Sequence, residues 1–189
     1  MSPPVVLFDA CIFYPASLRD VMMYLAGTGL FRAKWTDKIH DEWISNLLED
    51  QPEISPERLA RIRRKMDNAV LDALVVGYEP LINTVELPDP DDRHVLAAAI
   101  HAGATIIVTN NIRDFPADVL EPLGIKTLTP DEFLVRLIDE DAEDVLATIK
   151  RQRERLKNPP KTVDEHLATL EKQGLAKTVA ILREHRDAI

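Results

Sequence analysis

The sequence predicts an α/β domain built on a parallel sheet, followed by a tail made only of helices. Val5–Phe8 and Thr105–Val108 are short runs of mostly β-branched and aliphatic residues, which is typical of strands buried on both faces. A third run, Ile125–Leu128, follows in the same alternation with helical segments. That alternation favours a parallel sheet. We therefore expect an α/β domain over residues 1–130 and a helical extension over residues 131–189.

Composition narrows the class of protein. The 189 residues suit one domain, or one domain with an appendage, and 46% apolar residues are enough for a core. No apolar run approaches the roughly 18 residues of a membrane span, and Met1–Pro4 has no signal-peptide pattern. Cys11 is the only cysteine, which excludes an internal disulfide and a multi-cysteine zinc site. We expect a cytoplasmic protein that does not meet a membrane.

The net charge of −9 counts against a non-specific nucleic-acid binder, whose affinity comes mainly from Lys and Arg. That objection weakens if several acids surround a bound metal ion, because the ion reverses the local field. The net charge alone therefore does not exclude a protein that binds or cleaves nucleic acid.

Helical spacing of apolar residues, together with capping residues, predicts most of the remaining elements. Pro80–Leu87 is expected to be a loop with a short strand near Leu81–Val85. The expected helices cover Ser17–Ala26, Asp37–Glu49, a segment from Pro56 through Leu74 to Gly77, a segment from Asp91 or Asp92 to Gly103, Ala117–Leu123, Pro130–Asp139 and the tail beyond it.

The stretch from Pro88 to Phe115 contains two acids that the fold brings together. Asp91 or Asp92 is placed to cap a helix, which packs back along the sheet and is followed by the strand ending at Val108. Asp114 lies in the loop after that strand. Asp92 and Asp114 are thus expected at one end of the parallel sheet.

Two further acids belong to the same edge. Asp9 follows the first strand directly, at the end of the sheet where ligands collect, although a simple helix cap is the alternative. Glu42 borders the apolar stripe of its helix and points either to solvent or inward to a metal. Arg19 is equally well interpreted as a solvated charge or as a phosphate or carboxylate contact.

Clustered carboxylates repel one another, so either one stays protonated or a divalent cation neutralises them. Oxygen ligands without cysteine or clustered histidine favour Mg²⁺ or Mn²⁺ over zinc. A cation held in this way suits hydrolysis of a phosphodiester by a metal-activated water.

Other chemistries fit less well. An aspartyl-phosphate phosphatase needs a second Asp two residues after the first, where Cys11 stands. No glycine-rich phosphate loop is present. The basic cluster at Arg58–Lys65 is either a solvated helix face or a surface for RNA or an acidic partner.

The pattern resembles the PIN-domain ribonucleases, and within them the VapC-type toxins of bacterial toxin–antitoxin pairs. The matching pieces are the strand ending at Asp9, Glu42, the run Asp-Asp-Arg-His-Val-Leu-Ala-Ala-Ala at 91–99 and Thr-Asn-Asn-Ile-Arg-Asp-Phe at 109–115. The resemblance covers about residues 5–130. It implies a three-layer αβα sandwich with a central parallel sheet, here with a helical C-terminal extension.

The resemblance also implies roles for individual residues. Asp9, Glu42 and Asp92 match the main metal-binding acids, Asp114 matches a fourth, and Asp91 stays a candidate beside Asp92. Substrate contacts are expected from the set Thr109, Asn111, Arg19, Arg93 and Arg113.

The function so implied is a Mg²⁺- or Mn²⁺-dependent endoribonuclease that acts as a toxin. Its partners would be an RNA substrate, a cognate antitoxin and a second copy in a homodimer. The alternative is a PIN-like scaffold that binds RNA or protein with little catalysis. Asn111, which stands where many relatives have an acid, supports that alternative.

Overall fold

The computed structural model describes residues 2–189 and has a four-stranded parallel sheet in the order β2-β1-β3-β4. The strands are β1 Val5–Phe8, β2 Arg32–Lys34, β3 Ile106–Val108 and β4 Lys126–Leu128. The helices are α1 Ala10–Phe13, α2 Ala16–Ala26, α3 Asp37–Asp50, α4 Pro56–Ala69, α5 Arg93–Ala102, α6 Ala117–Leu120, α7 Pro130–Glu140, α8 Ala142–Arg155, α9 Val163–Lys172 and α10 Ala176–Glu184. The predicted α/β architecture with a parallel sheet and a helical C-terminal region is confirmed.

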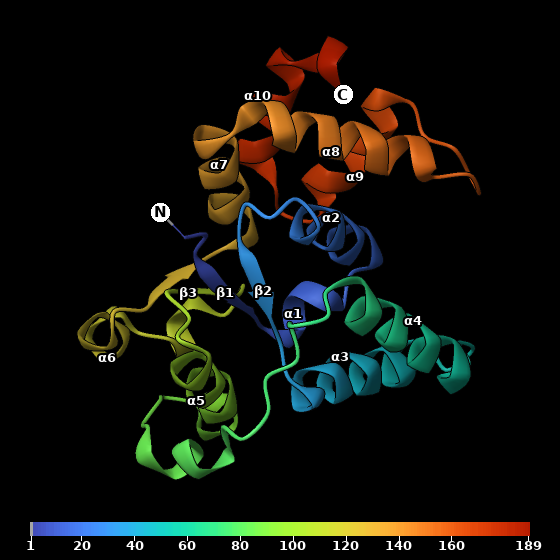
Figure 1. The fold of residues 1–189 in the computed structure, drawn as a ribbon. Coiled ribbons are helices and arrows are strands. Elements are labelled where there is room, and N and C mark those ends of the chain that lie inside the picture. Colours follow the sequence, from blue (N-terminus) through green and yellow to red (C-terminus); the bar gives the residue numbers. More distant parts are fainter. Residues whose placement is uncertain (1) are drawn as a thin grey trace.

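Helices cover the sheet in layers. In Figure 1, α5 lies below the sheet, α2 and α7 lie above it, and α8 and α9 stack outside α2. Val6, Leu7 and Phe8 of β1 and all of β3 are at most 2% exposed. Phe8 packs edge-on against Phe133 of α7 at 5.8 Å between ring centroids, so the start of the extension completes the core of the sheet domain.

Three local predictions were wrong. The helix beginning at Pro56 ends at Ala69, because Val70–Val75 leaves the helix and pairs alongside Trp35. Trp35 N–H donates to Ala73 O at 3.0 Å, and Val75 N–H donates to Trp35 O at 2.8 Å. The expected strand near Leu81–Val85 is instead a 3₁₀ helix, Glu79–Thr84, that packs on α5. The third concerns the start of α5, where Asp92 makes no side-chain capping bond.

Strand β2 was missing from the sequence-based assignment. Its three residues, Arg32–Lys34, read as a polar segment, yet Ala33 and Lys34 are buried. Lys34 Nζ donates to the carbonyl oxygen of Asp72, which satisfies its charge at the sheet edge. The strand exists because β1 and the segment around Ala73 supply its hydrogen bonds.

Hydrogen bonds tie α10 back to α7, the helix whose Phe133 packs on Phe8 of the sheet. Asp131 of α7 accepts hydrogen bonds from the N–H of Thr178 at 2.8 Å and of Lys177 at 3.0 Å, at the start of α10. The predicted capping boxes at Thr129–Glu132 and Thr162–Glu165 are both present. Across residues 2–189, none of the helices has the length and apolarity that crossing a membrane requires.

Candidate active site

Asp9 lies at the point where the strand order reverses. Residues Phe8 of β1 and Val108 of β3 are paired, so Asp9 and Thr109 follow side by side at the carboxyl ends of the two strands. In open α/β sheets this point is where ligands bind. Asp9 is 4% exposed, accepts from the N–H of Ala10 at 2.7 Å, and so also caps α1. Its position fits both interpretations that the sequence allowed.

Thr109 holds Asp9 rather than facing substrate. Its hydroxyl is fully buried and donates to Asp9 Oδ2 at 2.6 Å. The N–H of Asn111 donates to the Thr109 hydroxyl oxygen at 3.0 Å. These bonds correct the expectation of a substrate contact by Thr109, because the hydroxyl is already committed to Asp9. Asn111 itself is exposed at the rim.

Cys11 is a second neighbour of Asp9. Its thiol donates to Asp9 Oδ2 at 3.2 Å and its sulfur accepts from the N–H of Asn110 at 3.3 Å. Burial and the negative charge of Asp9 raise the pKa of Cys11 to about 12. The thiol therefore stays protonated as a hydrogen-bond donor, and it is not a nucleophile.

Asp92 stands across the site from Asp9, at the start of α5. Burial, followed by the negative charges of Asp9, Asp89 and Asp114, raises the pKa of Asp92 to about 6. Asp89 caps the 3₁₀ turn Pro90–Asp92 through a carboxylate that accepts from the N–H of Asp91 at 2.9 Å, whereas Asp92 occupies the N-cap position of α5 without a side-chain capping bond. Asp91 is exposed whereas Asp92 is half-buried, which favours Asp92 as the inward-facing acid.

Glu42 is partly exposed, and one of its carboxylate oxygens contacts His94. Its Oε1 lies 2.7 Å from Nε2 of His94, a side chain that is only 1% exposed. This pair links α3 to the first turn of α5. His94 Nδ1 is buried and has no hydrogen-bond partner among the described residues.

The predicted substrate arginines have different environments. Arg19 is buried, donates to the carbonyl oxygen of Phe13 and lies 4.8 Å from the ring centroid of Trp43, so it is not a solvated charge. Arg93 is half-buried beside Asp92, and Arg113 is exposed next to Asp114. Within the basic helix, Arg63 is tied to Asp37 and Asp41 of α3.

The donor chemistry of this site fits a hard divalent cation. Burial is the main cause of the raised pKa of Asp92, and the negative charges of Asp9, Asp89 and Asp114 add to it, so a cation bound among these oxygen donors would stabilise their charge. Within residues 2–189, no three acidic, His or Cys side chains are already drawn together as a metal-binding group. The carboxylates thus converge on one edge of the sheet without forming a closed cage.

A family model described as PIN domain matches residues 5–113, more than half of the chain. The chain belongs to the PIN-domain family. A second model, described as VapC50 C-terminal domain, matches residues 130–184 of this PIN protein. The protein named "Putative ribonuclease VapC50" from Mycobacterium tuberculosis is 39% identical over 106 residues, which are 56% of this chain and 62% of that relative. The match thus spans less than two thirds of the relative's length. No solved structure matches the chain.

Sequence reasoning missed two residues of the site, His94 as the partner of Glu42 and Cys11 as a donor to Asp9. The signal for Cys11 was its place two residues after Asp9, on the first turn that Asp9 caps. No spacing predicts the His94 contact, because it joins two helices that are about fifty residues apart in the chain.

Proposed function

We propose that this PIN protein is a metal-dependent endoribonuclease and the toxin of a type II toxin–antitoxin pair. The observation that carries the proposal is the position of Asp9 at the carboxyl end of β1, where the strand order reverses, with Asp92 near it: burial and then the charges of Asp9, Asp89 and Asp114 raise the pKa of Asp92. The match to the PIN domain and the likeness to the mycobacterial relative support the same activity.

Asp9, Asp92 and Asp114 would hold the cation, with Glu42 as a fourth ligand and Asp91 as a weaker candidate; Mg²⁺ and Mn²⁺ suit these oxygen donors. When bound, the ion supplies a Lewis acid that activates water and offsets charge on the phosphodiester. Thr109 and the N–H of Ala10 fix the Asp9 carboxylate, and His94 holds Glu42. Arg93, Arg113 and Asn111 border the acids at the positions where an RNA phosphate would approach.

The partners follow from this activity. An RNA strand is the substrate, a cognate antitoxin silences the toxin, and a second copy forms a homodimer in the cytoplasm. A scaffold with little catalysis is the alternative, and the absence of a closed three-residue metal group within residues 2–189 is the observation that favours it.

Cleavage of total RNA by the purified protein tests the proposal. Reactions with Mn²⁺, with Mg²⁺ and with EDTA are compared for the wild type, Asp9→Asn and Asp92→Ala. We expect discrete metal-dependent products, reduced in both variants by more than the roughly 100-fold that outer-shell losses cost. Cleavage that persists in Asp9→Asn would refute the site. A folded wild type that neither cleaves RNA nor binds Mn²⁺ in calorimetry would favour the scaffold.

A further inference from the structure

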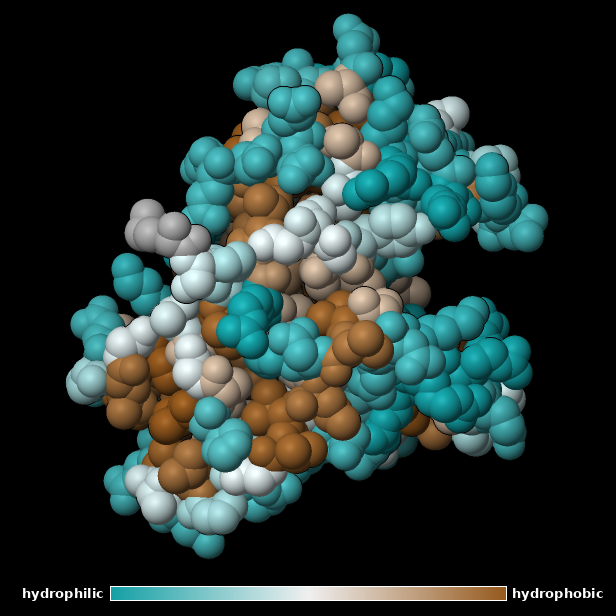
Figure 2. Space-filling view, in the orientation of Figure 1, coloured by the Kyte–Doolittle hydropathy of each residue, from teal (hydrophilic) through white to brown (hydrophobic). Residues whose placement is uncertain are grey.

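A cavity of about 690 Å³ lies between the sheet domain and the helical extension. Its walls come from α2, α4, α8, α9 and the chain between α8 and α9, and none of the candidate metal-binding acids lines it. Figure 2 shows the molecular outline hollowed between the C-terminal helices and α4. A volume of this size is ordinary for a site that takes a small ligand or one unit of a polymer.

Positive charge dominates the lining. Arg19, Arg58, Lys65 and Lys161 face the cavity from three sides, against the single acid Asp20. Asp20 is already engaged, because its Oδ2 accepts from Nε2 of Gln152. Within residues 2–189 the side chain of Arg58 forms no ion pair. A protein with a net charge of −9 therefore keeps a basic cavity in which, among the described residues, the charge of Arg58 is not paired.

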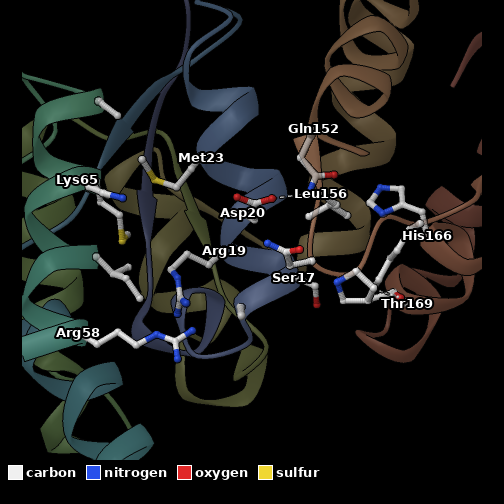
Figure 3. Close-up of a pocket in the computed structure, with 17 residues that line it drawn as sticks. Ser17, Arg19, Asp20, Met23, Arg58, Lys65, Gln152, Leu156, His166 and Thr169 are labelled. Atoms are coloured by element: carbon white, nitrogen blue, oxygen red, sulfur yellow. Dashed lines mark hydrogen bonds between the residues drawn. The ribbon is translucent and has the colours of Figure 1, made fainter. Parts of the chain in front are cut away.

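Two of these cations form an anion-binding end. Figure 3 shows Arg19 and Arg58 on the same side of the cavity, reaching from α2 and α4. Burial lowers the pKa of Arg19, the negative charge of Asp20 opposes this change, and the positive charge of Arg58, which lies near Arg19 in Figure 3, adds to the lowering. Planar guanidinium groups without a carboxylate between them suit a phosphate, which they bind through paired N–H donors.

At the other end of the cavity two buried polar side chains, Gln152 and His166, lie near the charged side chains of Asp20 and Lys161. Gln152 and His166 are each 2% exposed, and Gln152 Oε1 and His166 Nε2 have no hydrogen-bond partner among the described residues. Burial, with the positive charges of Lys161 and Arg153, lowers the pKa of His166 to about 4, so the ring is neutral at pH 7. Buried polar atoms without partners are costly, which makes them rare outside sites that receive a ligand.

The rest of the lining includes apolar side chains, of which Met23, Ile62, Met66 and Leu156 are the larger. A ligand that fits this lining has an anionic group, a flat apolar face and a polar edge. A nucleotide has all three, since its phosphate, its base and the hydrogen-bonding edge of the base follow in that sequence.

We propose that this cavity is a subsite for one nucleotide of single-stranded RNA, with Arg19 and Arg58 at the phosphate and Gln152 and His166 at the base edge. The inference rests on the ribonuclease function proposed above and assigns part of the substrate contact to the extension. Arg19 bonds the carbonyl of Phe13 at the end of α1, whose first turn Asp9 caps. Arg19 is thus anchored at the far end of the short helix that begins after Asp9, about 6 Å of helix rise from it.

Binding of a short, end-labelled single-stranded RNA of mixed sequence tests the proposal, measured by fluorescence anisotropy in EDTA at several salt concentrations. The key variant is Arg58→Glu, because Arg58 is exposed and its side chain has few contacts to lose. We expect the affinity to fall by about 10-fold or more and the slope of log affinity against log salt to decrease by about 0.7. Arg58→Lys should retain most of the affinity.

The matched control is Lys126→Glu, which reverses an exposed basic residue of β4 outside the cavity and should change binding little. Equal losses in Lys126→Glu and Arg58→Glu would overturn the subsite, and so would a wild type that does not bind RNA. Unchanged RNA binding in Arg58→Glu, with loss of binding to the co-expressed antitoxin, would assign the cavity to a protein partner and overturn it as well.

The experiments distinguish a failure of the nuclease proposal from a failure of the subsite proposal. Because the binding assay contains EDTA, it does not depend on the cation or on cleavage. If the wild type binds RNA through Arg58 but never cleaves it, the result supports the subsite and refutes the nuclease function. If the wild type cleaves RNA and Arg58→Glu binds and cleaves normally, the result supports the nuclease function and refutes the subsite.

Discussion

Nε2 of His94 lies 2.7 Å from Oε1 of Glu42, and this contact joins α5 to α3 beside the acids of the candidate metal site. His94 is buried, whereas Glu42 keeps about a third of its side chain exposed. A carboxylate with one oxygen held by a fixed ring can present the other in a single direction. His94 therefore takes the place of the outer-shell partners that orient metal ligands in proteins.

We expect His94→Ala to weaken Mn²⁺ binding by about 10- to 100-fold, because Glu42 loses the group that orients it. His94→Gln keeps a donor and should recover part of the affinity. Calorimetric titration with Mn²⁺ measures both, and thermal unfolding in EDTA reports any separate loss of stability. His101→Ala, an exposed histidine on the same helix, is the matched control. A destabilised His94→Ala that still binds Mn²⁺ normally would reduce His94 to a packing role.

Asp92→Asn should stabilise the metal-free protein at neutral pH. The pKa of Asp92 is raised from 3.8 to about 6, so the folded state holds the proton more tightly than the unfolded state does. This contribution to the free energy of unfolding is present below pH 4 and is lost as the pH rises through 6. The full shift corresponds to roughly 3 kcal/mol, which partial exposure reduces to about 1 kcal/mol.

Urea unfolding in EDTA at pH 4 and pH 7.5 measures this effect. The free energy of unfolding of Asp92→Asn should exceed that of the wild type at pH 7.5 and equal it at pH 4. Added Mn²⁺ should stabilise the wild type and leave Asp92→Asn nearly unchanged. An asparagine variant that is less stable than the wild type at pH 7.5 would contradict the repulsion between the acids.

Asp131→Ala should loosen the helical extension. The Asp131 carboxylate accepts from the N–H groups of Lys177 and Thr178 and from the Thr178 hydroxyl, and Thr178 is fully buried. Removing this acceptor leaves buried donors unpaired at a helix start, at a cost of about 2–3 kcal/mol.

Hydrogen exchange measured segment by segment shows which part of the chain loses stability in Asp131→Ala. Protection should decrease first in α9 and α10 and persist in β1 and β3. Asp139→Ala, at an exposed position of the same helix, serves as the control. Equal loss of protection in the sheet would contradict the predicted boundary near residue 130, because the two parts would then unfold as one unit.

His166 makes the protein sensitive to mild acid. Burial and two neighbouring cations lower its pKa from 6.5 to about 4, so the unfolded state binds the proton more readily than the folded state. Stability should therefore fall as the pH decreases from 6.5 to 4, by about 2–3 kcal/mol. His166→Phe removes the titrating group, so the stability difference between variant and wild type should grow across this window in urea unfolding. A difference that is independent of pH would exclude the buried neutral ring.

Several elements could be predicted because their signals are local. The apolar run that stops at Asp9, the capping boxes at Thr129 and Thr162 and the spacing of the tail helices all lie within a few residues of what they specify. Strand β2 and the pairing of Ala73 with Trp35 could not be predicted, since their partners lie far apart in the chain. The helix from Pro56 was extended too far for the same reason, because apolar spacing alone does not show whether a helix or a neighbouring strand buries those residues.

The sequence by itself determined the parallel α/β sheet, its helical extension and the acids that belong to the carboxyl ends of the strands, because periodicity, caps and strand ends are local features of the chain. Only the tertiary structure decided which atoms meet. In the tertiary structure the Thr109 hydroxyl donates to Asp9, Glu42 pairs with His94, and Arg19 and Arg58 line one cavity with His166. Those contacts join residues from different elements, and their partners are set by how the layers pack.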